Sequence, residues 1–443
     1  MNDRKINLDQ FHLLNKEGKP TGVYDFRIFQ YLCEKLDLFI LGSIPYIYQN
    51  GIYKPDLNGS RLKTEIRKLI YPQLIRSYTT DRIYKLFIDA AELQAEEKDL
   101  NLYPPHWIPF KNGYYDPIKR QMFPHSPSYK AINQLPHEYI PYKETEGKEV
   151  DKWLQFIAED PEDREMLLQY CGLCMTRDVR QQKFMILNGS GGSGKSTLIR
   201  MIEHVIGEDN IASISLKELS QRFASYGLMG KILNSCADLE VTALEDTSLI
   251  KKILGEDLIR AEAKGKNAVF FRSYAKLIFS TNELPAVLSE KTNGFYRRLL
   301  ILTMDKQPET VRPDYLEVLK GESDHFIQLC VKALQRLYES GTICESSNSK
   351  EAVESMRCDS DSVQAWIHDD CITEDPEARA ARIERNALFK RYAAYCERTE
   401  RKALTAHNFY KSLRLKGFKD GKDGRGARYF AGLLPLKVPD ITL

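Results

Sequence analysis

The stretch LNGSGGSGKSTL, residues 187–198, decides the fold. Its centre, GSGGSGKS at 189–196, satisfies the pattern G-x-x-x-x-G-K-[ST] at every position. Glycines let the backbone curl so that several amide hydrogens point at phosphate oxygens, and a following helix adds the positive end of its dipole. An apolar run, KFMIL at 183–187, precedes the loop, and a helical pattern, STLIRMIEHVIG at 196–207, follows it. The stretch therefore predicts a strand, a phosphate-binding loop and a helix.

The polar residues of this loop predict a nucleotide site that uses Mg²⁺. We expect Lys195 to reach the β- and γ-phosphates and the hydroxyl of Ser196 to help hold the metal. ATP and Mg²⁺ are therefore the expected substrate and cofactor. The residues expected to bind the nucleotide are Gly189, Ser190, Gly191, Gly192, Ser193, Gly194, Lys195, Ser196 and Thr197.

Two further segments read as strands that end in polar residues, KILNSCADLE at 231–240 and AKLIFSTNELP at 275–285. Strands that alternate with helical patterns predict an α/β fold with a mostly parallel sheet. In such sheets the ligand binds at the carboxyl ends of the strands. We therefore expect these polar ends to lie beside the glycine loop.

The polar strand ends supply candidates for the hydrolytic chemistry. Asp238 and Glu240 are two apart on an extended strand and so share a face. We assign Asp238 to the metal and Glu240 to the attacking water; the reverse assignment and a solvated acidic turn stay open. Asn282 is placed to contact both the γ-phosphate and the water, although asparagine also forms turns.

An arginine pair precedes another apolar run in GFYRRLLIL, 294–302. Arg297 or Arg298, supplied to the γ-phosphate of a neighbouring subunit, would neutralise charge in the transition state. The sequence does not decide between the two, and a surface ion-pair site is the alternative.

The bulk composition excludes several classes of protein. Among 443 residues, 64 basic and 62 acidic side chains nearly cancel, so the net charge of +2 indicates no partner. No apolar run approaches the ~20 residues that cross a bilayer, and MNDRKINLDQFHLL lacks the apolar segment of a signal peptide. Nine cysteines, odd in number and scattered, favour a reducing compartment. We expect a cytoplasmic protein without membrane contact.

Differences in residue pattern along the chain suggest three domains, at 1–146, 147–345 and 346–443. The first mixes helical patterns with short strands and turns, because eight of the nineteen prolines lie between Tyr103 and Pro141. The third combines three helical patterns with a glycine-rich basic ribbon, which predicts a winged-helix module. The acidic run CDSDS at 358–362 reads as a helix cap.

The third domain carries the clearest asymmetry of charge. Residues 401–430 contain nine Lys or Arg and two acidic residues. This is an electrostatic footprint for DNA, although a winged helix also serves protein contacts. The basic residues expected on the recognition helix and the wing are Lys411, Arg414, Lys416, Lys422, Arg425 and Arg428.

With these pieces in order, the chain resembles a superfamily 3 helicase of the AAA+ class, and in particular the helicase portion of phage and plasmid primase–helicases, which are related to the poxvirus primase–helicase. The matching segments are GSGGSGKST, KILNSCADLE, IKKILGEDLIRAEAKGKNAVFFRSYAKLIFSTNELP and GFYRRLLIL, in the family's order. Two departures stand out. Asp-Leu-Glu replaces the adjacent Asp-Glu of other AAA+ proteins, and Tyr296 stands where relatives often carry Trp.

The resemblance implies an AAA+ P-loop NTPase core between an α+β N-terminal domain and a C-terminal winged-helix domain. It implies a homo-hexamer in the cytoplasm of a bacterial host, with each ATP at a subunit interface, translocating along single-stranded or forked DNA, usually 3′-to-5′. A hairpin at DLIRAEAKGKNAVFF, 257–271, would project into the central channel. Arg260, Lys264 and Lys266 would there contact phosphates without sequence preference.

Three functions compete on this sequence. The leading one is a replicative helicase of a phage, plasmid or mobile element; a separate primase or initiator is a candidate partner, and the sequence does not decide whether a primase docks on the N-terminal domain. A P-loop kinase for a small molecule leaves the hairpin and the basic C-terminus without a role. An ATP-switched origin-binding initiator would bind one DNA sequence without separating strands.

Overall fold

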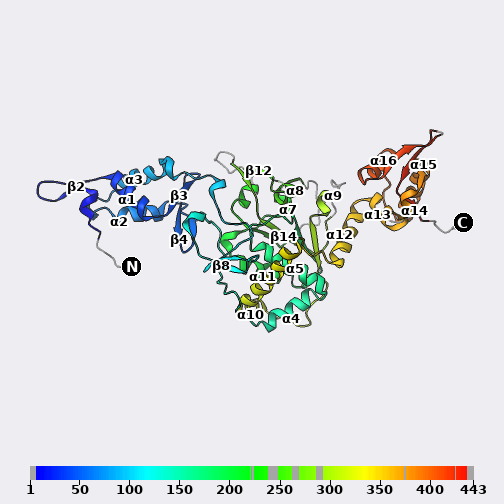
Figure 1. The fold of residues 1–443 in the computed structure, drawn as a ribbon, viewed down its shortest axis with the longest axis horizontal. Coiled ribbons are helices and arrows are strands. Elements are labelled where there is room, and N and C mark those ends of the chain that lie inside the picture. Colours follow the sequence, from blue (N-terminus) through cyan, green and yellow to red (C-terminus); the bar gives the residue numbers. More distant parts are fainter. Residues whose placement is uncertain are drawn as a thin grey trace. The chain divides into compact units, whose positions relative to one another are not determined.

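The apolar runs around the glycine loop form a five-stranded parallel sheet in the computed structural model (Figure 1). In spatial order its strands are β10 (Ile211–Ala212), β11 (Leu233–Cys236), β14 (Lys276–Thr281), β9 (Phe184–Asn188) and β15 (Leu299–Thr303). Every neighbouring pair is parallel. Strands covered on both faces read as continuous apolar runs, and β14 is buried along its whole length. The expected α/β fold with a mostly parallel sheet is confirmed.

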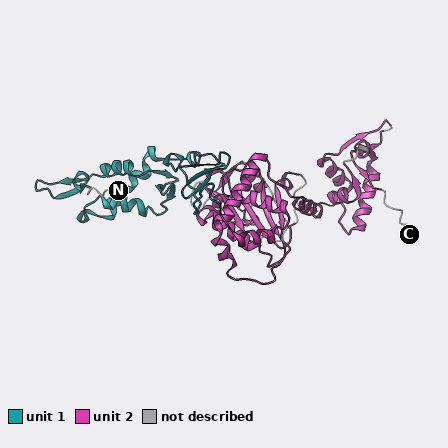
Figure 2. Ribbon diagram, turned by 60° about the horizontal axis from the view of Figure 1, so that its bottom comes forward, with its two compact units in different colours: residues 1–144 teal, residues 145–443 magenta. Residues whose placement is uncertain are grey.

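The structure describes residues 6–219, 221, 224–237, 248–261, 269–285, 293–373, 376–424 and 426–436. It divides into two compact units, residues 1–144 and 145–443 (Figure 2).

The first unit combines helices with short antiparallel strands. Its apolar core lies between the three helices, with Ile28, Ile66 and Ile83 fully buried. The proline-rich part forms three short strands and loops, as the prolines predict. The elements are β1 (His12–Leu14), β2 (Pro20–Val23), α1 (Asp25–Lys35), β3 (Leu38–Leu41), β4 (Ile44–Gln49), β5 (Ile52–Pro55), α2 (Ser60–Lys68), α3 (Ser77–Asp89), β6 (Ile108–Phe110), β7 (Gly113–Asp116) and β8 (Gln121–Phe123).

Helices surround the parallel sheet of the second unit. α6 packs on β11 and β14, α5 pairs with α11, and α12 lies along β15, adding Met356 to the core of the sheet. These elements are α4 (Lys148–Ile157), α5 (Pro161–Cys174), α6 (Lys195–Ile206), α7 (Leu216–Leu219), α8 (Ser248–Leu254), α9 (Asn293–Tyr296), α10 (Tyr315–Gly321), α11 (Ser323–Ser340) and α12 (Ser347–Ser360), with the antiparallel hairpin β12 (Leu258–Ala261) and β13 (Val269–Arg272).

The chain after α12 forms a small module around Trp366, Tyr392 and Phe409. The expected two-stranded ribbon has a third strand, because residues 382–384 pair with the edge of the ribbon that would otherwise be open. Asp361 caps α13, as expected for the acidic run. The elements are α13 (Ser362–Asp370), β16 (Cys371–Ile372), α14 (Pro376–Ala380), β17 (Arg382–Glu384), α15 (Arg385–Arg398), α16 (Ala406–Leu415), β18 (Lys419–Lys422), β19 (Arg428–Ala431) and β20 (Leu434–Pro435).

The described residues include no helix that is both long enough and apolar enough to span a bilayer. All nine cysteines carry free thiols.

Candidate nucleotide-binding site

The glycine loop joins the end of β9 to the start of α6, where backbone space is tight. Gly189 has φ +152°, and a Cβ there would lie 2.1 Å from the carbonyl oxygen of Met304. Gly194, at the N-cap of α6, has φ +95°, a left-handed conformation that other residues rarely adopt. These two glycines therefore fix the path of the loop and present the first turn of α6 to a ligand.

The ammonium of Lys195 lies at the centre of the loop. Its Nζ donates to the carbonyl oxygens of Gly189 at 2.5 Å and Ser190 at 2.9 Å, and to Oδ1 of Asn282 at 3.1 Å. Burial lowers the pKa of Lys195 from its usual value. The structure thus brings together the loop lysine and the asparagine that follows β14, two residues 87 positions apart in sequence.

A cavity of about 920 Å³ opens over this loop at the carboxyl end of the sheet. Its floor is formed by residues 191–197, Ala237 after β11, and Ser280, Thr281 and Asn282 at the end of β14. The rest of its lining is mixed. Apolar and aromatic side chains come from α4 (Trp153, Phe156 and Ile157) and from the segment before and into α10 (Pro308, Val311, Pro313, Tyr315 and Leu316), and polar or charged ones come from the same elements and from α6 (Glu149, Lys152, Arg200, Thr310 and Arg312). Volume and lining suit a ligand with one anionic and one apolar end.

The donors and acceptors at the loop fit a nucleotide carrying Mg²⁺. Ser193 Oγ and Asn188 Oδ1 are buried and have no hydrogen-bond partner among the described residues. Ser196 is exposed at the cavity, where its hydroxyl is an oxygen ligand of the kind Mg²⁺ takes. The carboxylates predicted to complete the site, Asp238 and Glu240, lie outside the described residues.

Sequence reasoning missed one wall of the cavity. The Gln307 amide donates to the Gly191 carbonyl oxygen at 2.7 Å, so the segment after β15 touches the loop directly. Arg312, also at the cavity, lies 3.5 Å from a carboxylate oxygen of Glu149 in α4. Neither the segment after β15 nor α4 carries a sequence motif, and only the fold brings them to the loop.

The arginine pair lies at the other end of the sheet. β15 runs parallel to β9 with Leu299 opposite Phe184 and Thr303 opposite Asn188, so Arg297 and Arg298 flank the start of β9 while the loop follows its end. Four residues of strand separate these ends by about 13 Å. Arg298 Nη2 donates to Gln182 Oε1 at 3.2 Å, whereas Arg297 is exposed.

The predicted DNA-binding residues separate into three groups. Lys264, Lys266 and Arg425 lie outside the described residues. Arg260 is exposed on β12, and Lys411, Arg414, Lys422 and Arg428 are exposed in the C-terminal module.

Lys416 differs from the expectation, because it points inward. Its side chain is 5% exposed, its Nζ lies 2.7 Å from an Asp361 carboxylate oxygen, and it donates to Gln364 Oε1 at 3.0 Å. Burial lowers the pKa of Lys416. The residue therefore holds α16 to α13, and its ammonium is not presented to a phosphate.

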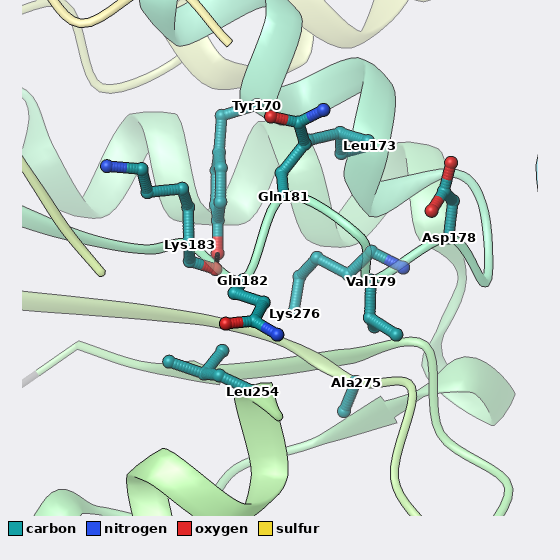
Figure 3. Close-up of a pocket in the computed structure, with 10 residues that line it drawn as sticks. All are labelled: Tyr170, Leu173, Asp178, Val179, Gln181, Gln182, Lys183, Leu254, Ala275 and Lys276. Atoms are coloured by element: carbon teal, nitrogen blue, oxygen red, sulfur yellow. Dashed lines mark hydrogen bonds between the residues drawn. The ribbon is translucent and has the colours of Figure 1, made fainter. Parts of the chain in front are cut away.

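A second, much smaller cavity of about 10 Å³ lies between α5, α8 and the starts of β9 and β14 (Figure 3). Its notable residue is Lys276, whose side chain is buried. The Nζ donates to the carbonyl oxygens of Thr176 at 2.5 Å and Tyr274 at 3.2 Å. Burial lowers the pKa of Lys276 from 10.5 to about 7.

Lys276 should make stability depend on pH. Between pH 7 and 10.5 the unfolded chain binds up to one proton more at this residue than the folded chain, so the contribution of Lys276 to stability rises with pH. In urea denaturation from pH 7 to 8.5, we expect the free energy of unfolding to rise more steeply in the wild type than in Lys276→Met, by up to about 1.4 kcal/mol per pH unit. Parallel profiles would show that Lys276 stays charged.

Comparison with known proteins finds two family models that each match part of this chain, and proteins that are similar to part of it. The model described as "D5 N terminal like" matches residues 22–159, and a family of unknown function, DUF5906, matches residues 187–298. A protein of Acanthamoeba polyphaga mimivirus named "Putative helicase L207/L206" is 28% identical over 205 residues, which cover 44% of this chain and 21% of the viral protein. This chain thus spans about a fifth of that relative's length.

Other similarities concern a kinase and a fold. A thymidylate kinase of Clostridium novyi (strain NT) is 30% identical over 138 residues, covering 28% of this chain and 66% of the kinase. Two apo structures of the NrS-1 C terminal region share the fold. One has a TM-score of 0.54 at 11% identity, covering 92% of this chain and 99% of that one. The other has a TM-score of 0.51 at 12% identity, covering 91% and 98%.

Proposed function

Since this chain is a phage-type primase–helicase-like protein, we propose that it is an ATP-dependent DNA helicase of replication. It works as a homo-hexamer on single-stranded and forked DNA, moves 3′-to-5′, and serves a phage, plasmid or mobile element in bacterial cytoplasm. The observation that carries this proposal is the cavity in which Lys195 and Asn282 meet at the carboxyl end of a parallel sheet. In such a fold this edge is where nucleotides bind.

The proposed domains are an N-terminal primase–helicase-associated domain at 1–146, a superfamily 3 AAA+ domain with a P-loop core at 147–345, and a winged-helix domain at 346–443. The N-terminal domain is the proposed docking site for a separate primase or initiator.

The groups at the glycine loop supply the chemistry for ATP hydrolysis. Backbone amides of residues 189–197 and the Lys195 ammonium bind the β- and γ-phosphates, where a cation favours the charge that develops as the bond breaks. Asn282, already hydrogen-bonded to Lys195, orients the γ-phosphate and the attacking water. Asp238 and Glu240 share the roles of metal ligand and base. Ser196 and Asp238 would hold Mg²⁺, which would neutralise phosphate charge.

We propose that Arg297 is the arginine that acts on the γ-phosphate in the nucleotide site of the neighbouring subunit. Neither arginine reaches the glycine loop of its own chain, because both lie at the opposite end of β15. Arg298 is engaged within its own chain, by the Gly294 carbonyl oxygen and Gln182. Arg297 is exposed and so is positioned to enter a neighbour's site.

The hairpin β12–β13 offers a surface suited to single-stranded DNA. Leu258, Arg260, Phe270 and Arg272 are exposed, with Leu258 opposite Arg272 and Arg260 opposite Phe270. Phe270 is 57% exposed and Leu258 is 55% exposed. Sites for single strands combine cationic side chains with aromatic rings on which bases stack. We therefore add Phe270 and Arg272 to Arg260, Lys264 and Lys266 as proposed DNA contacts.

Two substitutions in this hairpin should affect DNA binding in different ways. Phe270→Ala removes a stacking surface and should weaken binding of labelled oligo-dT about 5- to 100-fold with an unchanged salt dependence. Arg260→Ala should also reduce the slope of log affinity against log salt by about 0.7. Fluorescence anisotropy at several salt concentrations measures both effects, with Phe270→Tyr as the control that keeps the ring. Unchanged affinity in both variants would remove this face from the DNA path.

The C-terminal module is proposed as a second DNA contact through Lys411, Arg414, Lys422, Arg425 and Arg428. Arg414 is part of an exposed ion pair, with its Nε 3.1 Å from Asp420 Oδ2, which a phosphate can replace at little cost. We do not propose Lys416 as a DNA contact, because its ion pair is buried.

Similarity to a thymidylate kinase favours a second candidate, phosphate transfer to a small acceptor. ATP hydrolysis with and without single-stranded DNA, and product analysis with thymidylate, separate the two. A helicase should hydrolyse ATP faster with the DNA and leave thymidylate unchanged. Phosphorylated thymidylate, together with a rate insensitive to DNA, would replace the helicase by a kinase.

A further inference from the structure

A lysine at the start of β9 holds the backbone of the arginine pair. Lys183 Nζ donates to the carbonyl oxygen of Arg297 at 2.7 Å and lies 2.6 Å from Oε1 of Glu345. The side chain of Lys183 is only 9% exposed, whereas that of Glu345 is 38% exposed. In Figure 3 the ammonium of Lys183 points away from that of Lys276.

Two more contacts attach the same turn to the same segment. The backbone amide of Phe184 donates to the carbonyl oxygen of Arg298 at 2.8 Å, and Gln182 Oε1 accepts from Arg298 Nη2 at 3.2 Å. Gln182 itself has φ +52°, a conformation that places it in a tight turn. The backbone of residues 297–298 is therefore fixed on residues 182–184, and the guanidinium of Arg297 extends from a fixed base.

The backbone just before Glu345, whose carboxylate pairs with Lys183, is held by several hydrogen bonds. The Gln181 amide donates to the Gly341 carbonyl oxygen at 3.1 Å and accepts from the Ile343 amide at 3.0 Å, while the Cys344 amide donates to Gln169 Oε1 at 2.7 Å. These bonds hold the segment that ends in Glu345 just before α12. That helix in turn accepts from the Ile301 amide through Ser349 Oγ, at 2.9 Å. Lys183 thus links the start of β9, the segment just before α12, and residues 297–298, which we call the arginine turn.

We infer that Lys183, held by Glu345, is a positioning residue that fixes Arg297 for ATP hydrolysis in the neighbouring subunit. This inference rests on the proposed function, in which Arg297 acts in trans. An arginine that stabilises a transition state must be placed accurately, and a misplacement of about 1 Å can cost 10²-fold in rate. Hydrogen bonds between an ammonium and a carbonyl or carboxylate are short and directional enough to set such a position.

Lys183→Met is the direct test, because it keeps the length of the side chain and removes the ammonium. We expect kcat for DNA-stimulated ATP hydrolysis to fall about 10- to 100-fold with KM unchanged, since the nucleotide cavity lies at the other end of the sheet. Glu345→Gln should give a smaller loss in the same direction, and Lys183→Arg should recover part of the activity.

The matched control is Lys231→Met. Lys231 also precedes a strand of the sheet and donates to a backbone carbonyl oxygen, that of Asp209 at 2.7 Å, but it does not contact the arginine turn. Its kcat should stay within about twofold of the wild type. Thermal unfolding of each variant monitors folding, and if Lys183→Met does not fold, Glu345→Gln carries the test.

Two readouts separate positioning from general damage. Lys183→Met should add no further loss to Arg297→Ala, and mixing Lys183→Met with Lys195→Ala subunits should restore hydrolysis, because each variant keeps the element that the other lacks. If Arg297→Ala lowers kcat while Lys183→Met and Glu345→Gln do not, the positioning role is wrong and the proposed function stands. If Arg297→Ala itself has no effect, the proposed action in trans fails.

Discussion

Removing the Lys195 ammonium should lower ATP hydrolysis by about 10²–10³-fold, the effect typical of losing one electrostatic contact to a transition state. The Nζ of Lys195 donates hydrogen bonds to two loop carbonyl oxygens and to Asn282, and these bonds hold the ammonium where phosphate would bind. Lys195→Ala tests this in a steady-state ATPase assay.

Lys68→Ala is the control for Lys195→Ala, since Lys68 forms an exposed ion pair with Glu65 one helical turn away in α2. Such pairs contribute little, and hydrolysis should stay at the wild-type rate. A Lys195→Ala enzyme that hydrolyses ATP within threefold of the wild type, with an unchanged melting temperature, would show that the glycine loop is not the catalytic site.

Arg297→Ala should have an equal or larger effect, about 10³-fold or more, as is typical for arginines supplied in trans. Arg298→Ala should instead lower the melting temperature, because Arg298 ties α9 to Gln182 within its own chain. Separate assays of hydrolysis and thermal unfolding distinguish the two arginines.

Mixing subunits shows whether Arg297 acts in trans. In an equal mixture of Arg297→Ala and Lys195→Ala, about a quarter of the head-to-tail interfaces in a ring combine an intact loop with an intact Arg297. Hydrolysis should return to a measurable fraction of the wild-type rate. A mixture as inactive as its components, although mixed rings form, would place Arg297 outside the neighbour's site.

The parallel sheet was predictable because its signals are local. KFMIL, the glycines and the helical pattern of 196–207 lie within one stretch, and the structure places β9 and α6 there. The rule for strand ends then brought Asn282 to the loop. The cavity lining outside the loop and the strand ends was not predictable, because α4 and residues 308–316 carry no motif and meet the loop only through the fold.

Single charges were the weakest part of the prediction. Lys416 and Lys411 look alike in sequence, yet Lys416 pairs with Asp361, 55 residues earlier, and its ammonium is buried. Lys183 is the opposite case, a residue with no predicted role whose contacts the structure reveals. Nothing in the nearby sequence indicates these contacts, and its partners Arg297 and Glu345 are distant in the chain. A three-residue strand such as β17 has too little pattern to be recognised at all.

Strand displacement on a forked duplex, with ATP and Mg²⁺, tests the central claim most directly. The wild type should release the labelled strand only when ATP is present, and Lys195→Ala should release none while still folding. A wild-type protein that hydrolyses ATP and binds the fork but separates no strands would contradict the account.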